Sequence, residues 1–315
     1  MQSKARQTGW WSVALALLGA SVACGSKMES AWETDLQSQQ QAQSGQTQQE
    51  AGGEATDPRA ALLAEAEAAW KARDEQGKVE EAIAKWRKAL EMDRADAETW
   101  GKLSRAYYFL ADCHLRFDES AEDRMAPTFD EGRKAAEKAL SALSPEFARR
   151  MVDGERIEEA IQVLDRRAVP ALYWRSANMG KWASYEGFAT LLAYKDEVKA
   201  IMQWCLEQDE SFYYGGPHRY FGAYFARIPA MAGRDLKKSK EHFEKSLQFE
   251  PNYFATRVLY AQDYAVNAQD RATFDAQLEY VLGHDPAELP DAAPENACEQ
   301  RKARALKERA EEVFE

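Results

Sequence analysis

Apolar residues recur every three or four positions through most of the chain beyond residue 58, and this spacing predicts helices. In the stretch EEAIAKWRKAL, Ala82, Trp86 and Ala89 are four and three residues apart, so they share one helix face. Runs of β-branched residues, which would favour strands, are few. We therefore expect an all-α fold, with residues 59–315 forming a single domain.

A repeated pattern links neighbouring helices. Eleven residues after Ala89, the residues Trp100, Leu103, Ser104 and Tyr107 have the spacing W-x2-L-S-x2-Y. This resembles the first helix of a tetratricopeptide repeat, in which such residues meet the second helix of the unit before. The spacing predicts that Trp100 and Tyr107 lie against the helix that carries Trp86.

A second copy of the pattern is better formed, and its residues are Ser239, Phe243, Ser246, Pro251, Tyr260, Ala261 and Tyr264. Looser second helices lie within residues 130–145 and 195–210, and residues 272–286 continue the second copy. We therefore expect degenerate tetratricopeptide-type helix pairs with inserted helices, stacked as an α-solenoid-like domain.

The spacing between the copies is irregular. From Tyr107 to Gly132 the chain runs 25 residues, where the repeat has about nine. Residues 146–195 fit no repeat at all. Because insertions into repeats commonly gather on one face and build a binding surface, we expect function to lie in these departures.

The start of the chain has the pattern of an export signal. Lys4 and Arg6 precede an apolar run that ends at Cys24 and is too short to span a bilayer comfortably. The sequence LLGASVAC resembles a bacterial lipoprotein signal, which predicts lipidation of Cys24. Ser21, where such signals usually have leucine, leaves cleavage by an ordinary signal peptidase open. By the same resemblance, Gly25 favours the periplasmic side of the outer membrane.

Residues 24–58 are rich in glutamine and have almost no large apolar side chains. Such a composition buries too little surface to offset the entropy of ordering the chain. We expect a disordered tether with a span of roughly 30 Å. The predicted organisation is a signal peptide over 1–23, a lipid-anchored tether over 24–58 and a helical domain over 59–315.

Charge and cysteine content exclude several classes of function. The net charge is −12, and removal of the signal with Lys4 and Arg6 makes it −14. Such acidity argues against nucleic acid as a partner and against binding to anionic lipid. Three cysteines follow Cys24 and form no CxxC pair, so no zinc site is indicated. One disulfide among the three is possible, but buried free thiols are the simpler expectation.

The stretch FYYGGPHRYFGAYF, residues 212–225, contains two glycines and a proline in a block of aromatic residues. It predicts a turn between helices, with glycine at the left-handed exit and Pro217 in the first turn of the next helix. Arg219 either pairs with a neighbouring acid or helps the helix end to hold an anion. His218 has no partners at metal-ligand or catalytic spacing. No phosphate-loop, GxSxG or HExxH motif follows the signal, so we expect no enzyme, metal or cofactor.

A second aromatic cluster lies in Val169–Phe188, where Tyr173, Trp174 and Trp182 fall within ten residues. Core packing is the simpler interpretation, because aromatic residues at helical spacing are usually core. Rings with polar tips also line pockets for apolar ligands that carry one polar group. The candidates for such a ligand cleft are Tyr173, Trp174, Trp182, Tyr213, His218 and Arg219.

These motifs together resemble a known family. VPALYWRSANMGKWA, GGPHRYFGAYFARIPA and SKEHFEKSLQFEPNYFATRVLYAQDYAV, in this order behind a lipoprotein-like signal, resemble the TatT component of tripartite ATP-independent periplasmic (TRAP) transporters. The resemblance covers residues 59–315. It implies a homotrimeric α-helical lipoprotein that docks a periplasmic solute-binding protein and offers a hydrophobic cleft or pore for its ligand.

Two functions are therefore open. One is a TRAP-associated lipoprotein whose cleft receives an organic acid with an apolar part. The alternative is a scaffold lipoprotein for envelope assembly that binds no ligand. A cavity lined by the aromatic candidates separates the two, because a scaffold needs none.

Overall fold

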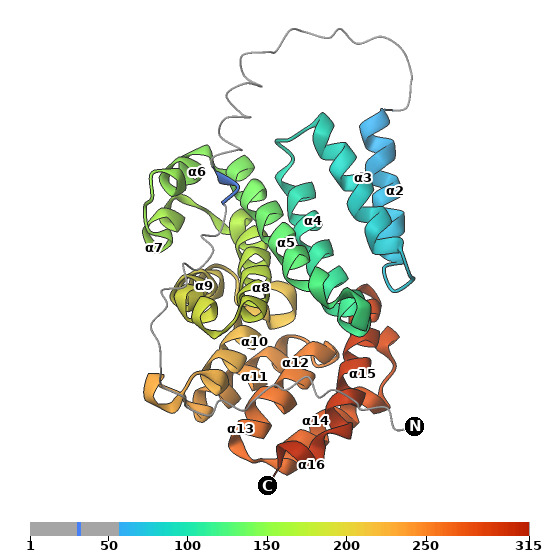
Figure 1. Ribbon diagram of the computed structural model, residues 1–315, viewed down its shortest axis with the longest axis vertical. Coiled ribbons are helices and arrows are strands. Elements are labelled where there is room, and N and C mark those ends of the chain that lie inside the picture. The colour runs from blue at the N-terminus through green and yellow to red at the C-terminus, as the bar shows by residue number, and fades with distance from the viewer. Residues whose placement is uncertain (1–29, 33–56, 315) are drawn as a thin grey trace, which may run out of the picture.

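The computed structural model describes residues 30–32 and 57–314 of the chain, and this part is built from helices without a β-strand (Figure 1). The expectation of an all-α fold is confirmed, whereas the tetratricopeptide arrangement stays a prediction. The principal helices are α2 (Pro58–Lys71), α3 (Lys78–Met92), α4 (Ala97–Phe109), α5 (Glu122–Leu143), α6 (Pro145–Val152), α7 (Ile157–Ala160), α8 (Val169–Glu186), α9 (Phe188–Gln208), α10 (Phe212–Arg227), α11 (Leu236–Phe249), α12 (Phe254–Leu259), α13 (Val266–Ala268), α14 (Arg271–Gly283), α15 (Ala293–Glu308) and α16 (Ala310–Val313).

Aspartates cap several of these helices. Asp96 accepts a hydrogen bond from the Thr99 amide at the start of α4, and Asp235 and Asp270 do the same for α11 and α14. Each such cap satisfies one of the backbone N–H groups that a helix start leaves without a partner. The helix boundaries are therefore fixed by local chemistry as well as by the apolar face.

Helices that are neighbours in sequence pack together, α2 on α3, α4 on α5, α8 on α9 and α10 on α11, and α5 also packs extensively on α8. The predicted face of α3 is buried, with Trp86 1% exposed. On α4, Leu103, Ser104 and Tyr107 are buried. Trp100 packs against the core cluster that contains Trp86, as expected, but it is only half-buried, at the edge of a groove.

Two π-helical turns interrupt the regular helices in the described part of the chain. Leu110–His114 continues α4, and Tyr260–Ala265 continues α12. Such turns often occur at functional sites because they displace the side chains that follow. The first of them directs Asp112 and Cys113 toward α15.

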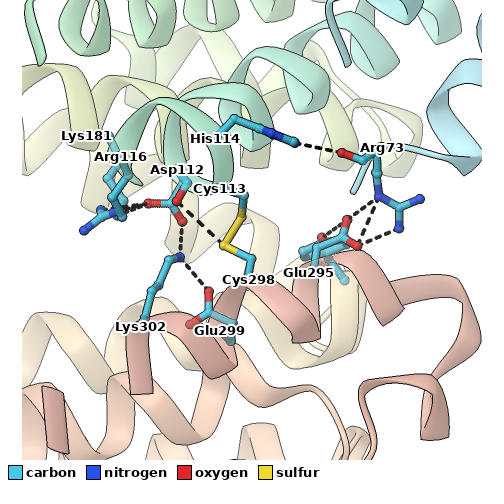
Figure 2. Close-up of a disulfide and its surroundings, with 11 residues drawn as sticks. Arg73, Asp112, Cys113, His114, Arg116, Lys181, Glu295, Cys298, Glu299 and Lys302 are labelled. Atoms are coloured by element: carbon cyan, nitrogen blue, oxygen red, sulfur yellow. Dashed lines mark hydrogen bonds and ion pairs between the residues drawn. A yellow bond between two sulfur atoms is a disulfide. The ribbon is translucent and has the colours of Figure 1, made fainter. Parts of the chain in front are cut away.

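Helix α15 returns to the other half of the molecule and is bonded to it covalently. Cys113 and Cys298, 185 residues apart in the sequence, form a disulfide between the turn after α4 and α15 (Figure 2). The expectation of free thiols is therefore wrong for these two cysteines. It holds for Cys205, which is buried and free. Spacing alone did not reveal the pairing, because the two positions meet only when the chain folds back.

Three residues of the segment expected to be a tether, Ser30–Trp32, lie on the folded domain. The Ala31 amide donates a 3.0 Å hydrogen bond to the buried Glu137 carboxylate on α5. Trp32 is 4% exposed, and its ring meets Phe147 edge-on at 5.4 Å. For these residues the structure differs from the expected tether, because one tryptophan supplies enough apolar surface to dock the segment.

We expect Trp32→Ala to lower the free energy of unfolding by about 2 kcal/mol, the value of one large buried side chain. The effect is limited because the segment can undock without unfolding the domain. Urea unfolding measures it, and a variant that begins at residue 57 should show the same loss. A Trp32→Ala variant as stable as wild type would contradict the docking.

Candidate ligand-binding site

The site is built on the first turn of α10, which has an unusual backbone. Tyr213, Tyr214 and Gly215 all have left-handed conformations, with φ of 48°, 60° and 69°. This region suits glycine but is strained for tyrosine, and such strain clusters at functional sites. The expected turn before Pro217 is thus confirmed, but it begins two residues earlier than the glycines.

The turn brings four rings together. Tyr173 and Trp174 of α8 meet Tyr213 at centroid distances of 6.0 and 4.8 Å. The ring of Tyr253, before α12, lies 5.4 Å from that of Tyr213. Gly216 permits the close approach of α10 to α8, because a Cβ there would lie 2.7 Å from the Tyr173 ring. These rings form an aromatic cluster, named here by its members Tyr173, Trp174, Tyr213 and Tyr253.

Arg219 lies at the centre of this aromatic cluster. Its guanidinium donates hydrogen bonds to the Tyr173 hydroxyl at 3.0 Å and to the carbonyls of Tyr213 and Tyr214 at 3.2 Å each. It also lies 4.7 Å from the centroid of the Tyr253 ring. The contacts to the two carbonyls hold the left-handed turn in place, so Arg219 positions the backbone as well as the charge.

No carboxylate among the described residues pairs with Arg219, which is 5% exposed. The other three arginines of the buried class differ in this respect. Arg73 pairs with Glu295 at 2.6 Å, Arg133 with Glu137 at 2.6 Å, and Arg175 with Glu197 at 2.7 Å. Burying an unpaired charge is costly. Among the described residues the alternative in which Arg219 pairs with an acid is therefore wrong, and its guanidinium is bonded to neutral oxygens instead.

The surrounding tyrosines stabilise this charge without neutralising it. Burial raises the pKa of Tyr213 and of Tyr253 well above the usual value, so both stay neutral at physiological pH. Burial opposes the charge on Arg219, but the oxygens of Tyr173 and the other tyrosines outweigh this and raise its pKa. The cluster therefore keeps one full positive charge.

A second cation borders the aromatic cluster on its other side. The guanidinium of Arg105, on α4, lies 4.9 Å from the centroid of the Tyr213 ring. Unlike Arg219, it has a partner in Glu295 at 2.7 Å. The Tyr213 ring thus has two guanidinium groups near it, at 4.9 and 5.8 Å, and its hydroxyl donates a 3.4 Å hydrogen bond to the Glu295 carboxylate.

Two of the six predicted cleft residues lie elsewhere. Trp182 is two turns beyond Trp174 on α8 and packs in a separate core cluster, with its ring 5.7 Å from that of Tyr194. His218 faces α11, where its ring lies 5.9 Å from Phe249. The predicted lipidation site, Cys24, lies outside the described residues.

Sequence reasoning missed Tyr253 and Arg105. Tyr253 falls in the turn between α11 and α12, which the repeat pattern accounted for without assigning it a contact. Arg105 is one of several charged residues on α4, and only its contacts distinguish it. Nothing in the sequence pattern predicted that Tyr213 and Tyr214 would adopt a left-handed backbone conformation.

His218 belongs to a pair of histidines between α10 and α11. Its Nδ1 lies 2.9 Å from Nδ1 of His242, and its Nε2 lies 3.0 Å from the Glu210 carboxylate. Burial, and then the charges of His218 and Lys238, lower the pKa of His242 to about 4. The described residues contain no group of three or more His, Cys, Asp or Glu side chains arranged to hold a metal ion.

The lowered pKa of His242 predicts a loss of stability in acid. Between about pH 6.5 and pH 4 the unfolded chain binds a proton at this histidine and the folded chain does not, so stability falls as the pH falls. We expect Tm to decrease from pH 7 to pH 5 and His242→Gln to lack this part of the decrease. Thermal unfolding in a pH series measures it. An equal slope in the variant would contradict the prediction.

Over the described residues the protein is helical and has a buried aromatic cluster around Arg219. Residues 109–314 match the family described as the TRAP transporter T-component, and the chain belongs to this family. This confirms the resemblance noted in the sequence. Membership associates the protein with TRAP transport systems of the cell envelope, and the family is a transporter component rather than an enzyme.

One curated relative is an uncharacterized protein of Treponema pallidum (strain Nichols), which is 23% identical over 215 residues. The match covers 65% of this chain, and the chain spans only 65% of the length of that relative. In the part of the chain that the structure describes, no helix is long and apolar enough to cross a membrane.

Proposed function

We propose that this protein is a lipid-anchored TRAP accessory that docks a periplasmic solute-binding protein and receives its ligand. The ligand is an organic acid with an apolar part. One observation carries the proposal: Arg219 is a buried cation without a carboxylate partner, enclosed by aromatic rings. In a scaffold that binds no ligand, Arg219 would serve only to hold the left-handed turn.

The chemistry of the aromatic cluster defines the ligand class. The terminal N–H groups of Arg219 already donate to Tyr173, Tyr213, Tyr214 and Thr256. A carboxylate would therefore have to replace two of these acceptors, in the paired geometry that favours arginine over lysine. The apolar part would lie against Trp174 and Tyr213, whose rings contact each other in this structure. Entry therefore requires Tyr213 to move, and the strained backbone at this residue favours such a movement.

Docking and assembly need an exposed apolar surface. At the start of α9, Phe188 is 71% exposed and Leu192 is 51% exposed, and Leu191 is next to them. Exposed apolar patches of this kind commonly mark protein contacts. The patch supports a contact with another protein chain, either in the homotrimer that the family resemblance implies or with the solute-binding protein.

Anchoring through Cys24 would hold this domain close to the outer membrane. Because Ala31 is docked on α5, only six residues lie between Cys24 and this docked position. This short connection reaches at most about 25 Å. The reach is shorter than that of a tether formed by all of residues 24–58.

Capture from the envelope tests the docking. The tagged protein, cross-linked in cells and purified from the envelope fraction, should recover a TRAP-type solute-binding protein identified by mass spectrometry. A variant with Phe188→Ser and Leu192→Ser should lose either this partner or the trimer mass. Recovery of envelope-assembly factors without any solute-binding protein would favour the scaffold.

A further inference from the structure

A groove between α3, α4 and α5 lies apart from the aromatic cluster. Its volume is about 330 Å³. Helix α4 forms the floor through Trp100, Leu103 and Tyr107, while α3 and α5 form the two walls. The volume is at the lower end of the range that small organic ligands occupy.

The floor of the groove is apolar and aromatic. Leu90, Leu103 and Ala135 are 2–3% exposed, so they are core residues whose remaining surface faces the groove. Trp100 is half-buried, and its indole N–H donates a 3.0 Å hydrogen bond to the Arg94 carbonyl. This bond fixes the ring as a rigid side of the groove.

The walls carry unpaired positive charge. Arg87 on α3 and Lys138 on α5 line the groove from opposite sides, and neither forms an ion pair with any described residue. The Lys138 ammonium lies 4.7 Å from the centroid of the Trp100 ring. Lys134 differs, because Asp130 pairs with it at 2.8 Å. The carboxylates of Glu91 and Glu131 also line the groove, together with Arg94. The groove thus carries four cations and two carboxylates, a net positive surface in a chain with a net charge of −12.

Tyr107 adds a hydroxyl group to the same place. It is 8% exposed, and burial raises the pKa of this group, whereas the neighbouring Arg87 lowers it. The hydroxyl therefore remains protonated at neutral pH. It lies beside the Arg87 guanidinium, between the apolar floor and the charged walls of the groove.

We propose that this groove is a second binding site, which takes a small amphipathic organic anion. The carboxylate or sulfonate lies between Arg87 and Lys138, and the apolar part lies against Leu90, Leu103 and the Trp100 ring. Charge-assisted bonds from two cations and one hydroxyl would fix the anion. The inference stands on the groove alone and is independent of the ligand proposed for Arg219.

Calorimetric titration with 1-anilinonaphthalene-8-sulfonate tests the site, because this probe joins a sulfonate to aromatic rings. Wild type should bind it, and the double variant Arg87→Gln with Lys138→Gln should bind about tenfold more weakly, as expected for lost charge-assisted contacts. A matched control, Lys88→Gln with Lys240→Gln, makes the same change in charge outside the groove. It should bind as wild type does, and so should Arg219→Lys.

Three results would overturn the proposal. The first is equal affinity in the groove variant and wild type, with thermal unfolding showing that both are folded. The second is loss of probe binding in Arg219→Lys alone, which would place the probe in the aromatic cluster. The third is binding of an acidic peptide in place of the probe, which would make the groove a protein-docking surface.

A further control conserves the charge of the groove. The double variant Arg87→Lys with Lys138→Arg should retain most of the affinity for the probe.

Discussion

Replacing Cys298 with serine is expected to lower the free energy of unfolding by about 4 kcal/mol. The disulfide joins positions 185 residues apart, so it removes many conformations from the unfolded chain. A loop-closure estimate gives about 5 kcal/mol for such a length, and measured values for disulfides are usually lower. The bond also joins α15 to the turn after α4, which no other covalent link does among the described residues. Urea unfolding of the oxidised proteins measures the loss.

Two controls separate loss of the bond from the effect of serine itself. The double variant Cys113→Ser with Cys298→Ser should be about as stable as the single variant. A reductant should destabilise wild type and leave the double variant unchanged. Insensitivity of wild type to reductant, once mass spectrometry shows its thiols to be free, would contradict a structural role for the disulfide.

The second large effect is expected at Asp112, which is next to the disulfide. This carboxylate is 4% exposed and binds Lys181 at 3.0 Å and Lys302 at 2.5 Å (Figure 2). Asp112→Asn keeps the shape but leaves Lys181 without its anion, while Lys302 keeps Glu299 at 2.7 Å. Breaking a buried ion pair by removing one partner costs about 3–5 kcal/mol. We expect a loss of this size in chemical unfolding at neutral pH.

The pKa values in this network give the prediction its pH dependence. Although burial opposes it, the charges of Lys181 and Lys302 hold the pKa of Asp112 well below its usual value. Its contribution is therefore present at neutral pH and is lost only in acid, below the usual carboxyl range. Burial lowers the pKa of Lys181 to about 8. Asp112→Asn should remove the acid-sensitive part, and an unchanged acid profile would contradict this account.

The disulfide and the Asp112 network join the same two elements, so their effects should not add. Neighbouring residues that share an interface commonly show coupling of about 0.5–3 kcal/mol. A cycle of Asp112→Asn, Cys298→Ser and the double variant measures it. Strict additivity would mean that the two contacts stabilise separate parts of the fold.

The sequence predicted much of the helical fold, because a helix face can be read from residue spacing. Ala82, Trp86 and Ala89 are buried on one face of α3, as their spacing indicates. Residue spacing shows which face of a helix is buried, but it does not show which other helix packs against that face. Trp174 and Trp182 lie on one side of α8, yet they belong to different core clusters because the helices that cover α8 change along its length.

Residue spacing also predicted only part of the candidate site, because it does not show which element each side chain faces. His218 and Arg219 are consecutive, and consecutive helical residues point about 100° apart. Only Arg219 can therefore face α8, while His218 faces α11. Local residue spacing could not predict contacts between segments that are distant in the sequence. The disulfide between Cys113 and Cys298 and the docking of Trp32 are both contacts of this kind.

The central claim is that Arg219 receives a carboxylate in the aromatic cluster, and a calorimetric titration tests it most directly. Hexanoate and phenylacetate serve as probes, with hexanamide and phenylacetamide as neutral counterparts. Arg219→Lys keeps the charge but loses the paired donors, and Arg234→Lys is a matched control at an exposed position after α10.

The account predicts that wild type and Arg234→Lys bind the carboxylates and not the amides, and that Arg219→Lys binds them about tenfold more weakly. Thermal unfolding should show all three proteins folded. A folded wild type that binds neither carboxylate, or a folded Arg219→Lys variant with unchanged affinity, would contradict it.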